Sequence, residues 1–351
     1  MSRFHLVAAA LIAGWLVPAH TLEAQQQDSL GYVHPEFMER SYFFKNIPDS
    51  RTVDYYEAFL ALHLPFRQKL QETYDKVLAM PGPHHTVAVF GSMSVNLRQT
   101  QEESAPVRTP SYMPKVTVTY YRVQQVEPDP PSPLSKEPRV VSLLTIPFVP
   151  YGHYSNGQDG CLFESQARQG EDCVDTATVA RPRSVNRHDG SFSSHYMELG
   201  IYYRRIALDS VFGAGSRVGA RSYWSIGGHV RSYEVYNGLG GSMSKELRDA
   251  YGPLRVRLLG QWVGQRNGRF WGPGLRRFEG FVELIPGHPD EVPPVRVSVE
   301  AARTMDKRGG WGVFARVYTG QDDYNLGFLT RITVLQLGAT ISQERMPSFH
   351  Q

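Results

Sequence analysis

The sequence of 351 residues lacks any long apolar run. A helix that crosses a bilayer needs about 18 or more consecutive apolar residues, and no stretch of the chain supplies them. The chain also lacks a block of one charge sign, because its formal net charge is +3 and its Lys, Arg, Asp and Glu residues are scattered. Without a basic stripe interleaved with aromatic residues, the sequence gives no case for nucleic-acid binding. If the protein lies in a membrane, it crosses the membrane as strands.

Two familiar enzyme motifs are also missing. No G-x-S-x-G turn occurs, so the α/β-hydrolase route to serine chemistry lacks its motif. The glycines of "NGLGGSM" do not complete a G-x-G-x-x-G fingerprint, and no strand-helix unit surrounds them. Neither of these α/β architectures is therefore indicated.

Cysteine is scarce, with only Cys161 and Cys173, which lie in one polar segment. In an exported protein, two nearby cysteines most simply form a disulfide that closes a short loop. A metal site is the alternative, but it needs histidine or further thiolate ligands at suitable spacing, and none lies nearby. We expect the disulfide.

The N-terminus has the pattern of an export signal. Arg3 and His5 precede an apolar segment from Leu6 to Val17, and Ala19 and Ala24 offer cleavage sites. We therefore expect residues 1–24 to be a signal peptide. Residues 25–54 are expected to form an N-terminal extension, and residues 55–351 to form the folded domain.

From about Tyr56 onward, apolar and polar residues alternate in segments separated by Gly, Pro, Asp and Asn. Period-two alternation predicts about ten to twelve strands with one apolar and one polar face. Only "FRQKLQETYDKVLAM", at Phe66 to Met80, has helical periodicity. A soluble sandwich and a closed barrel both fit this count. The export signal, the strand lengths and the 19 Tyr and 5 Trp available for interfacial girdles favour an antiparallel transmembrane β-barrel. A long polar loop is expected at residues 158–190.

One short segment, "YGHYSNG" at Tyr151 to Gly157, has the composition of a catalytic site. Residues i and i+2 of a strand point to one face, so His153 and Ser155 are expected side by side, as a base and a nucleophile would be. Asn156 and Gly157 then form a tight turn whose N–H groups can face a developing oxyanion. The alternative is a strand end that happens to carry small polar residues.

This segment resembles the active-site strand of the outer membrane phospholipase A family. "EESAPVRTPSYMP" at Glu102 to Pro114, "YEAFLALHLPF" and "VFARVYTGQDDYN" resemble other segments of that family, in the same order along the chain. The resemblance implies a barrel of about twelve antiparallel strands in the bacterial outer membrane. It also implies calcium-dependent hydrolysis of phospholipid acyl esters (phospholipase A1/A2 activity) and a homodimer when active.

By position, the resemblance assigns Ser155 as the nucleophile, His153 as the general base and the Gly157 N–H to the oxyanion. The family uses an asparagine to orient the base, whereas this sequence has His195 there, in "DGSFSSHYMEL". A neutral histidine can still accept the N–H of His153, so His195 is expected to orient it. Glu198 is the other candidate, but on a regular strand it faces away from His195; a bulge would reverse that choice.

The resemblance also implies a calcium site. Its ligand positions fall on the Ser104 hydroxyl, the Gln158 backbone carbonyl and the Ser191 hydroxyl, all hard oxygen donors suited to calcium. Asp159 and Asp189 lie close enough in sequence to contribute. The alternative is that Ser104 and Ser191 are loop serines that form turn hydrogen bonds.

Two other functions remain open. A lipid A deacylase also carries an H-x-S-N signature, but that family uses a smaller barrel of about eight strands and a Glu about a dozen residues past the serine. The second alternative is a structural or transport barrel without catalytic activity. The number of strands distinguishes the deacylase from the phospholipase.

Overall fold

The computed structural model describes most of the chain, and the fold is discussed for these residues. They are residues 39–48, 54–67, 69–80, 82–100, 107–126, 140–176, 184–208, 217–234, 247–248, 251–268, 272–286, 294–305, 310–322, 324–342 and 348–350. The predicted signal peptide, residues 1–24, and Ser104 lie outside them.

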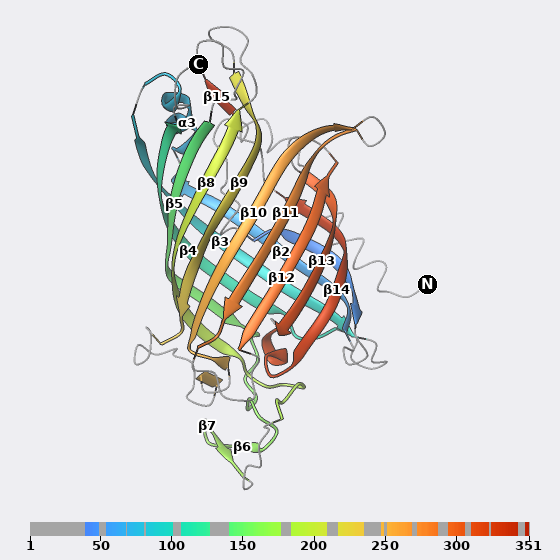
Figure 1. Cartoon of the computed structure of the whole chain (residues 1–351). Coiled ribbons are helices and arrows are strands. Elements are labelled where there is room, and N and C mark those ends of the chain that lie inside the picture. Colours follow the sequence, from blue (N-terminus) through green and yellow to red (C-terminus); the bar gives the residue numbers. More distant parts are fainter. Residues whose placement is uncertain are drawn as a thin grey trace, which may run out of the picture.

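Twelve antiparallel strands form a closed barrel, which confirms the predicted fold class (Figure 1). Each strand pairs with its neighbours in the chain, β5 pairs with β8, β1 pairs with β14, and the pairing of β9 with β10 completes the circuit. Closure leaves no open sheet edge, as a barrel in lipid requires. The barrel strands are β1 (Ser41–Pro48), β2 (Asp54–Arg67), β3 (His84–Thr100), β4 (Ser111–Val126), β5 (Val140–Ser155), β8 (Ser193–Leu208), β9 (Arg217–Ser232), β10 (Leu254–Gly268), β11 (Gly272–Leu284), β12 (Val295–Thr304), β13 (Gly310–Gln321) and β14 (Arg331–Ser342).

The remaining elements lie at the two ends of the barrel. At one end, the helix α3 (Leu70–Val77) packs against β3, β4 and the short strand β15 (Ser348–His350), within the segment where helical periodicity predicts a helix. At the opposite end lie the 3-10 helix η1 (Asn325–Gly327) and the hairpin of β6 (Gln166–Gln169) and β7 (Asp172–Asp175). None of the described helices is long and apolar enough to span a membrane.

The predicted N-terminal extension contributes a strand. Tyr42, Phe44 and Asn46 of β1 are buried, whereas the intervening Phe43, Lys45 and Ile47 are exposed. This alternation is shorter than in the other barrel strands. Because β1 pairs with both β2 and β14, it closes the wall between the first and last parts of the chain.

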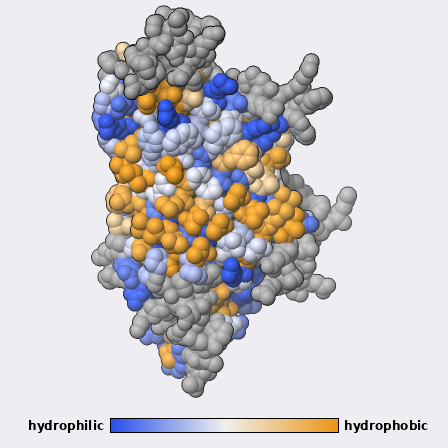
Figure 2. Space-filling view, in the orientation of Figure 1, coloured by the Kyte–Doolittle hydropathy of each residue, from blue (hydrophilic) through white to orange (hydrophobic). Residues whose placement is uncertain are grey.

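Alternate side chains point outward and inward along the strands. The outward set is rich in large apolar side chains, with Leu199 and Ile201 of β8 exposed by 56% and 57%. Figure 2 shows a band of hydrophobic side chains across the middle of the face in view, with more hydrophilic residues toward the ends. Such a band is typical of the lipid-facing surface of a membrane barrel.

The lumen is filled rather than open in the described part of the chain. Ion pairs lie within it, among them Arg98 with Glu57 and Asp322, and Lys115 with Glu39. An apolar cluster that includes Leu70 and Tyr74 of α3 lies toward one end. A second cluster, here called the aromatic end cluster, lies at the end that carries Ser155. Its buried members are Val149, Tyr154, Leu162, Phe163, Val185, Phe192, Tyr196, Tyr233, Leu247, Tyr251, Leu326 and Phe328.

The loop predicted at residues 158–190 contains the β6–β7 hairpin, which projects beyond the barrel at the bottom of Figure 1. A disulfide joins Cys161 to Cys173, as the sequence predicts. The base of the loop is held to the barrel by a bridge between Gly160 and Gly190. The hairpin therefore starts beside the end of β5, where "YGHYSNG" lies.

Candidate active site

The pairing of β5 with β8 brings the two predicted site histidines together. His153 lies opposite His195, and Ser155 lies opposite Ser193 in the next outward-facing row. The imidazole centroids of His153 and His195 are 4.6 Å apart, and their Nδ1 atoms are 3.4 Å apart. Directly opposed residues are the closest neighbours across an antiparallel pair, so the register of these two strands creates the contact.

A bulge in β5 decides which way these side chains face. From Val141 to Val149 the odd-numbered side chains are buried, whereas after Tyr151 the even-numbered positions Gly152 and Tyr154 are buried. The register shifts between Val149 and Gly152, at Pro150 and Tyr151. Proline lacks the N–H that a regular ladder needs and is often found at bulges. The extra residue therefore turns His153 and Ser155 to the lipid-facing side.

Ser155 lies two residues beyond His153 on this outward face, at the end of the strand. Within the described part of the chain, its hydroxyl makes no hydrogen bond. One hydrogen bond can form between the two Nδ1 atoms. Which histidine donates it depends on the tautomers of the two rings. If His153 donates through Nδ1, its Nε2 carries the free lone pair that a general base requires.

Glu198 does not orient His153. Its carboxylate is buried on the lumen side, where Oε2 accepts a hydrogen bond from Arg231 Nε at 2.8 Å. His229 Nδ1 is 3.9 Å from the other carboxylate oxygen. The bulge that changes the direction of His153 lies in β5. The strand β8 has no bulge in this region and keeps a regular alternation, so Glu198 faces away from His195, as expected for a regular strand.

Aromatic and apolar side chains surround the histidines on the outer wall. The Tyr151 ring lies 5.3 Å from that of His195, and Tyr112 of β4 pairs with Ser155. Farther along the same face, toward the middle of the barrel, Phe148 and Leu199 lie opposite each other. An apolar surface thus extends from the polar group at the strand end to the middle of the wall.

Asn156 joins the two strands behind the site, a role that sequence reasoning missed. Its side chain is buried, with Nδ2 donating to Gly190 O at 2.8 Å. Its Oδ1 accepts hydrogen bonds from Phe192 N at 2.9 Å and Gln158 N at 3.2 Å. Because these bonds link the residue after Ser155 to the start of β8, Asn156 fixes the separation of the two strand ends. The motif contained the residue, but nothing in the sequence indicated its partners.

Gly157 follows with a positive φ of 69°, in a region that side chains other than glycine rarely adopt. Its backbone N–H makes no hydrogen bond to any residue that the structure describes. A Cβ at this position would lie 3.8 Å from Tyr112 Cε2, so the turn is next to the outer wall. A free N–H beside Ser155 is the type of donor that an oxyanion accepts.

The described candidate calcium ligands lie at the base of the loop. Ser191 N donates to Gly160 O at 2.8 Å, which places Ser191 beside the segment that contains Gln158. The side-chain Oε1 of Gln158 is buried and has no hydrogen-bond partner, while its Nε2 donates to Thr109 Oγ1 at 2.8 Å. A buried oxygen without a donor is compatible with a cation, and neutral oxygens suit calcium.

The acidic candidates near this segment are occupied or solvated. Asp159 is exposed and lies 3.4 Å from Arg168, and Asp189 accepts a hydrogen bond from Asn186 at 2.6 Å. The described residues contain no group of three or more His, Cys, Asp or Glu side chains that could hold a metal. The assignment of calcium to Gln158, Ser191 and Ser104 therefore stays a prediction, and Ser104 lies outside the described residues.

The chain matches no family model, and no curated protein matches its sequence. Its structure is similar to outer membrane phospholipase A from Escherichia coli, with 9% identity and a TM-score of 0.46 over 90% of this chain and 98% of that one. The calcium-bound dimer of the Salmonella typhi outer membrane phospholipase is similar at 9% identity and a TM-score of 0.46, over 90% and 94% of the two chains. An active-site mutant of the Escherichia coli protein has 10% identity and a TM-score of 0.44, over 89% and 95%. At such identities and TM-scores, these similarities are not evidence of a shared activity.

Proposed function

We propose that this protein is an outer-membrane esterase that hydrolyses acyl esters of glycerophospholipids, with Ser155 as its nucleophile. One observation carries the proposal: His153 and His195 are in contact on the lipid-facing wall, beside an outward-facing serine. A serine becomes a useful nucleophile when a base within reach takes its proton and a third group holds that base. The outward direction favours a substrate that arrives through the bilayer.

The chemistry assigns one role to each group. His153 Nε2 takes the Ser155 hydroxyl proton as Oγ bonds to the ester carbonyl carbon, while the His153 Nδ1–H donates to His195 Nδ1. The oxyanion that forms accepts a hydrogen bond from the Gly157 N–H. When the carbonyl re-forms, the bond to the alcohol breaks, and the leaving oxygen takes the proton from His153. Water then hydrolyses the acyl-serine by the same steps, with His153 again as the base.

Calcium is part of the proposal, held by Gln158 and Ser191 together with Ser104. A bound calcium ion would polarise the ester carbonyl and stabilise negative charge. The neutral donors and the unpartnered Gln158 oxygen support this assignment. Active protein is proposed to be a homodimer in the bacterial outer membrane.

The outer wall suits an ester that remains in the membrane. Its acyl chains would lie along the apolar surface that includes Phe148, Leu199 and Ile201, while the carbonyl reaches Ser155 at the strand end. A soluble substrate would gain nothing from this apolar surface.

The decisive test is release of fatty acid from phosphatidylcholine in mixed micelles containing calcium. We expect Ser155→Ala to lower the rate on the order of 10³-fold or more, and a chelator to remove the wild-type activity. Ser193→Ala is the matched control, because Ser193 is an outward-facing serine opposite Ser155 on the neighbouring strand. Absence of wild-type activity, or equal loss in both variants, contradicts the proposed mechanism.

The two alternatives fit the structure less well. A lipid A deacylase-like enzyme is expected to have about eight strands, whereas this barrel has twelve. A structural or transport barrel leaves the outward-facing histidine pair without a purpose. The packed lumen also disfavours transport.

A further inference from the structure

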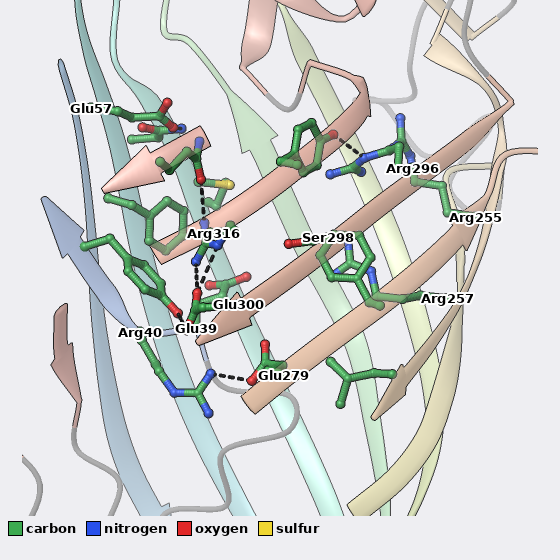
Figure 3. A pocket seen from close by; sticks show the side chains of 18 of the residues that line it. Glu39, Arg40, Glu57, Arg255, Arg257, Glu279, Arg296, Ser298, Glu300 and Arg316 are labelled. Atoms are coloured by element: carbon green, nitrogen blue, oxygen red, sulfur yellow. Dashed lines mark hydrogen bonds and ion pairs between the residues drawn. The ribbon is translucent and has the colours of Figure 1, made fainter. Parts of the chain in front are cut away.

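A polar cavity of about 270 Å³ lies within the barrel lumen, separate from the outward-facing site. Figure 3 shows Arg255, Arg257, Arg296 and Ser298 gathered on one side of this cavity. They come from β10 and β12, which flank β11 in the wall.

Three arginines contact one carboxylate, and the cross-strand register places two of them. Arg257 of β10 lies opposite Glu283 of β11, which lies opposite Arg296 of β12. Arg257 Nη2 is 2.6 Å from Glu283 Oε2, Arg255 Nη1 is 3.1 Å from Oε1, and Arg296 also donates to Oε1. Glu283, Arg255 and Arg296 are almost completely buried.

Positive charge exceeds negative charge in this cluster. Among the residues that the structure describes, Glu283 is the only acid in contact with Arg255 or Arg257. These two guanidinium groups already outnumber the carboxylate. Excess charge away from bulk water is costly unless it is paired. A bound anion would supply the missing charge.

Two further donors lack an acceptor. Ser298 lines the cavity, and its hydroxyl makes no hydrogen bond within the described residues. Arg255 Nε is buried without a hydrogen-bond partner. Oxygen atoms of an anion accept strong hydrogen bonds from guanidinium and hydroxyl donors.

We propose that this cluster binds one small tetrahedral oxyanion, either inorganic phosphate or the phosphate group of a small molecule. The cavity is far smaller than a phospholipid, and the site lies on the opposite side of the wall from Ser155. The proposal is therefore independent of the proposed esterase activity.

Binding is measured by equilibrium dialysis of radiolabelled inorganic phosphate against folded protein in detergent, at fixed ionic strength. We expect one saturable site per chain, weakened roughly tenfold or more by Arg257→Gln, since a hydrogen bond to a charged group is removed. Arg316→Gln is the matched control. Arg316 lines the same cavity but lies outside this cluster. Among the described residues it is one of two arginines paired with a buried glutamate, Glu300, and its side chain is 20% exposed against 21% for Arg257.

A second pair of variants tests the sign of the effect. Glu283→Gln removes the one carboxylate among the described residues that Arg255 and Arg257 contact, so phosphate should raise its thermal unfolding midpoint more than that of the wild type. Glu300→Gln should show no such gain. If Arg257→Gln does not fold, Ser298→Ala, which leaves the charges unchanged, replaces it and should weaken phosphate binding while Ser193→Ala does not.

Competition identifies the form of the ligand. Displacement by glycerol 3-phosphate as well as by sulfate indicates a site for phosphate esters, and displacement by sulfate alone indicates a site for the inorganic ion. Absence of saturable binding to the wild type overturns the proposal. Equal loss in Arg257→Gln and Arg316→Gln also overturns it, because the response would then reflect the total charge of the lumen.

Discussion

At the scale of single residues, the proposed chemistry depends on how two imidazoles share one proton. When His153 donates its Nδ1–H to His195, its Nε2 is left able to accept the Ser155 proton. Protonation of His195 removes the Nδ1 lone pair that accepts the His153 N–H. The His195 ring would then donate a hydrogen bond to His153 instead. A histidine in this place makes the orienting group itself sensitive to pH, which an asparagine is not.

His195→Asn tests this directly. The asparagine amide oxygen can accept the His153 N–H at any pH, so we expect the variant to keep activity and to lose one ionisation. In the pH profile of kcat/KM, the acid limb should fall with the protonation of one group rather than two. His195→Leu offers no acceptor and should lower kcat on the order of 10²-fold. Identical acid limbs in the wild type and His195→Asn would show that His195 does not accept the proton.

Asn156 is the residue whose loss should disturb the site without opening the barrel. Asn156→Ala leaves the backbone N–H of Phe192 and the carbonyl of Gly190 unpaired, at a cost of about 1–3 kcal/mol in the free energy of unfolding. We expect activity to fall as well, because the end of β5 is no longer held to β8. Urea titration and the lipase assay measure the two effects.

Asn46→Ala provides the comparison for that experiment. Asn46 is also a buried asparagine, which accepts a hydrogen bond from Gln336 at 3.0 Å, but it lies on β1, away from Ser155. Its replacement should lower stability and leave activity unchanged. If both variants lose activity in proportion to their stability, Asn156 has no specific positioning role.

At the scale of elements, the bulge in β5 separates two phases of alternation within one strand. Residues before Pro150 follow one phase and residues after Tyr151 follow the other. The strand therefore contributes Val149 and Tyr154 to the lumen while His153 and Ser155 face the lipid.

A one-residue insertion tests the role of the alternation that follows the bulge. An alanine inserted between Gly152 and His153 shifts the later side chains by one position, which turns His153 and Ser155 into the lumen and Tyr154 to the lipid. We expect loss of fatty-acid release in protein that still shows the electrophoretic mobility of a folded barrel. Deletion of Tyr151 is the control and should keep activity, because a regular ladder without the extra residue still has Gly152 facing the lumen and His153 and Ser155 facing the lipid. An active insertion variant would be incompatible with this account.

The sequence predicted the elements better than it predicted their partners. Alternation of apolar and polar residues indicated the strands, because each strand records locally which side chains face lipid. The bulge breaks that alternation near Pro150, so periodicity alone could not tell which way His153 points. The eight-residue β1 gave little signal, and it becomes a barrel strand by pairing with β14 near the other end of the chain.

The same limit applied to the site. His153 and Ser155 are two residues apart and were predicted from the motif, and His195 was predicted from its position in the family resemblance. The role of Asn156 depends on Gly190 and Phe192, which are 34 and 36 residues away. The arginine cluster at Glu283 likewise arises from register between strands, which composition does not encode.

At the scale of the whole molecule, the lumen is part of the fold rather than a passage. The aromatic end cluster closes the end near Ser155, and buried ion pairs join side chains of different strands within the lumen. Tyr154 contributes to that cluster from between the two proposed catalytic residues. One strand segment therefore contributes both to the proposed site on the outer wall and to the packed interior.

Conductance through planar bilayers tests whether the lumen is closed. We expect reconstituted protein to give no stable ohmic channel, because bulky side chains and paired charges occupy the lumen of the described barrel. An open porin of known conductance, reconstituted in the same way, is the control. A reproducible open channel would favour the transport alternative over the esterase.

The outward direction of Ser155 also determines which concentration governs the rate. A serine in a cleft meets molecules that diffuse through water. Under the proposed activity, this serine meets molecules that diffuse laterally in the bilayer. Under the proposed activity, diluting the substrate with inert lipid should slow turnover at constant bulk concentration. Because the encounter takes place in two dimensions, the rate should depend on the surface concentration of the substrate rather than on its bulk concentration.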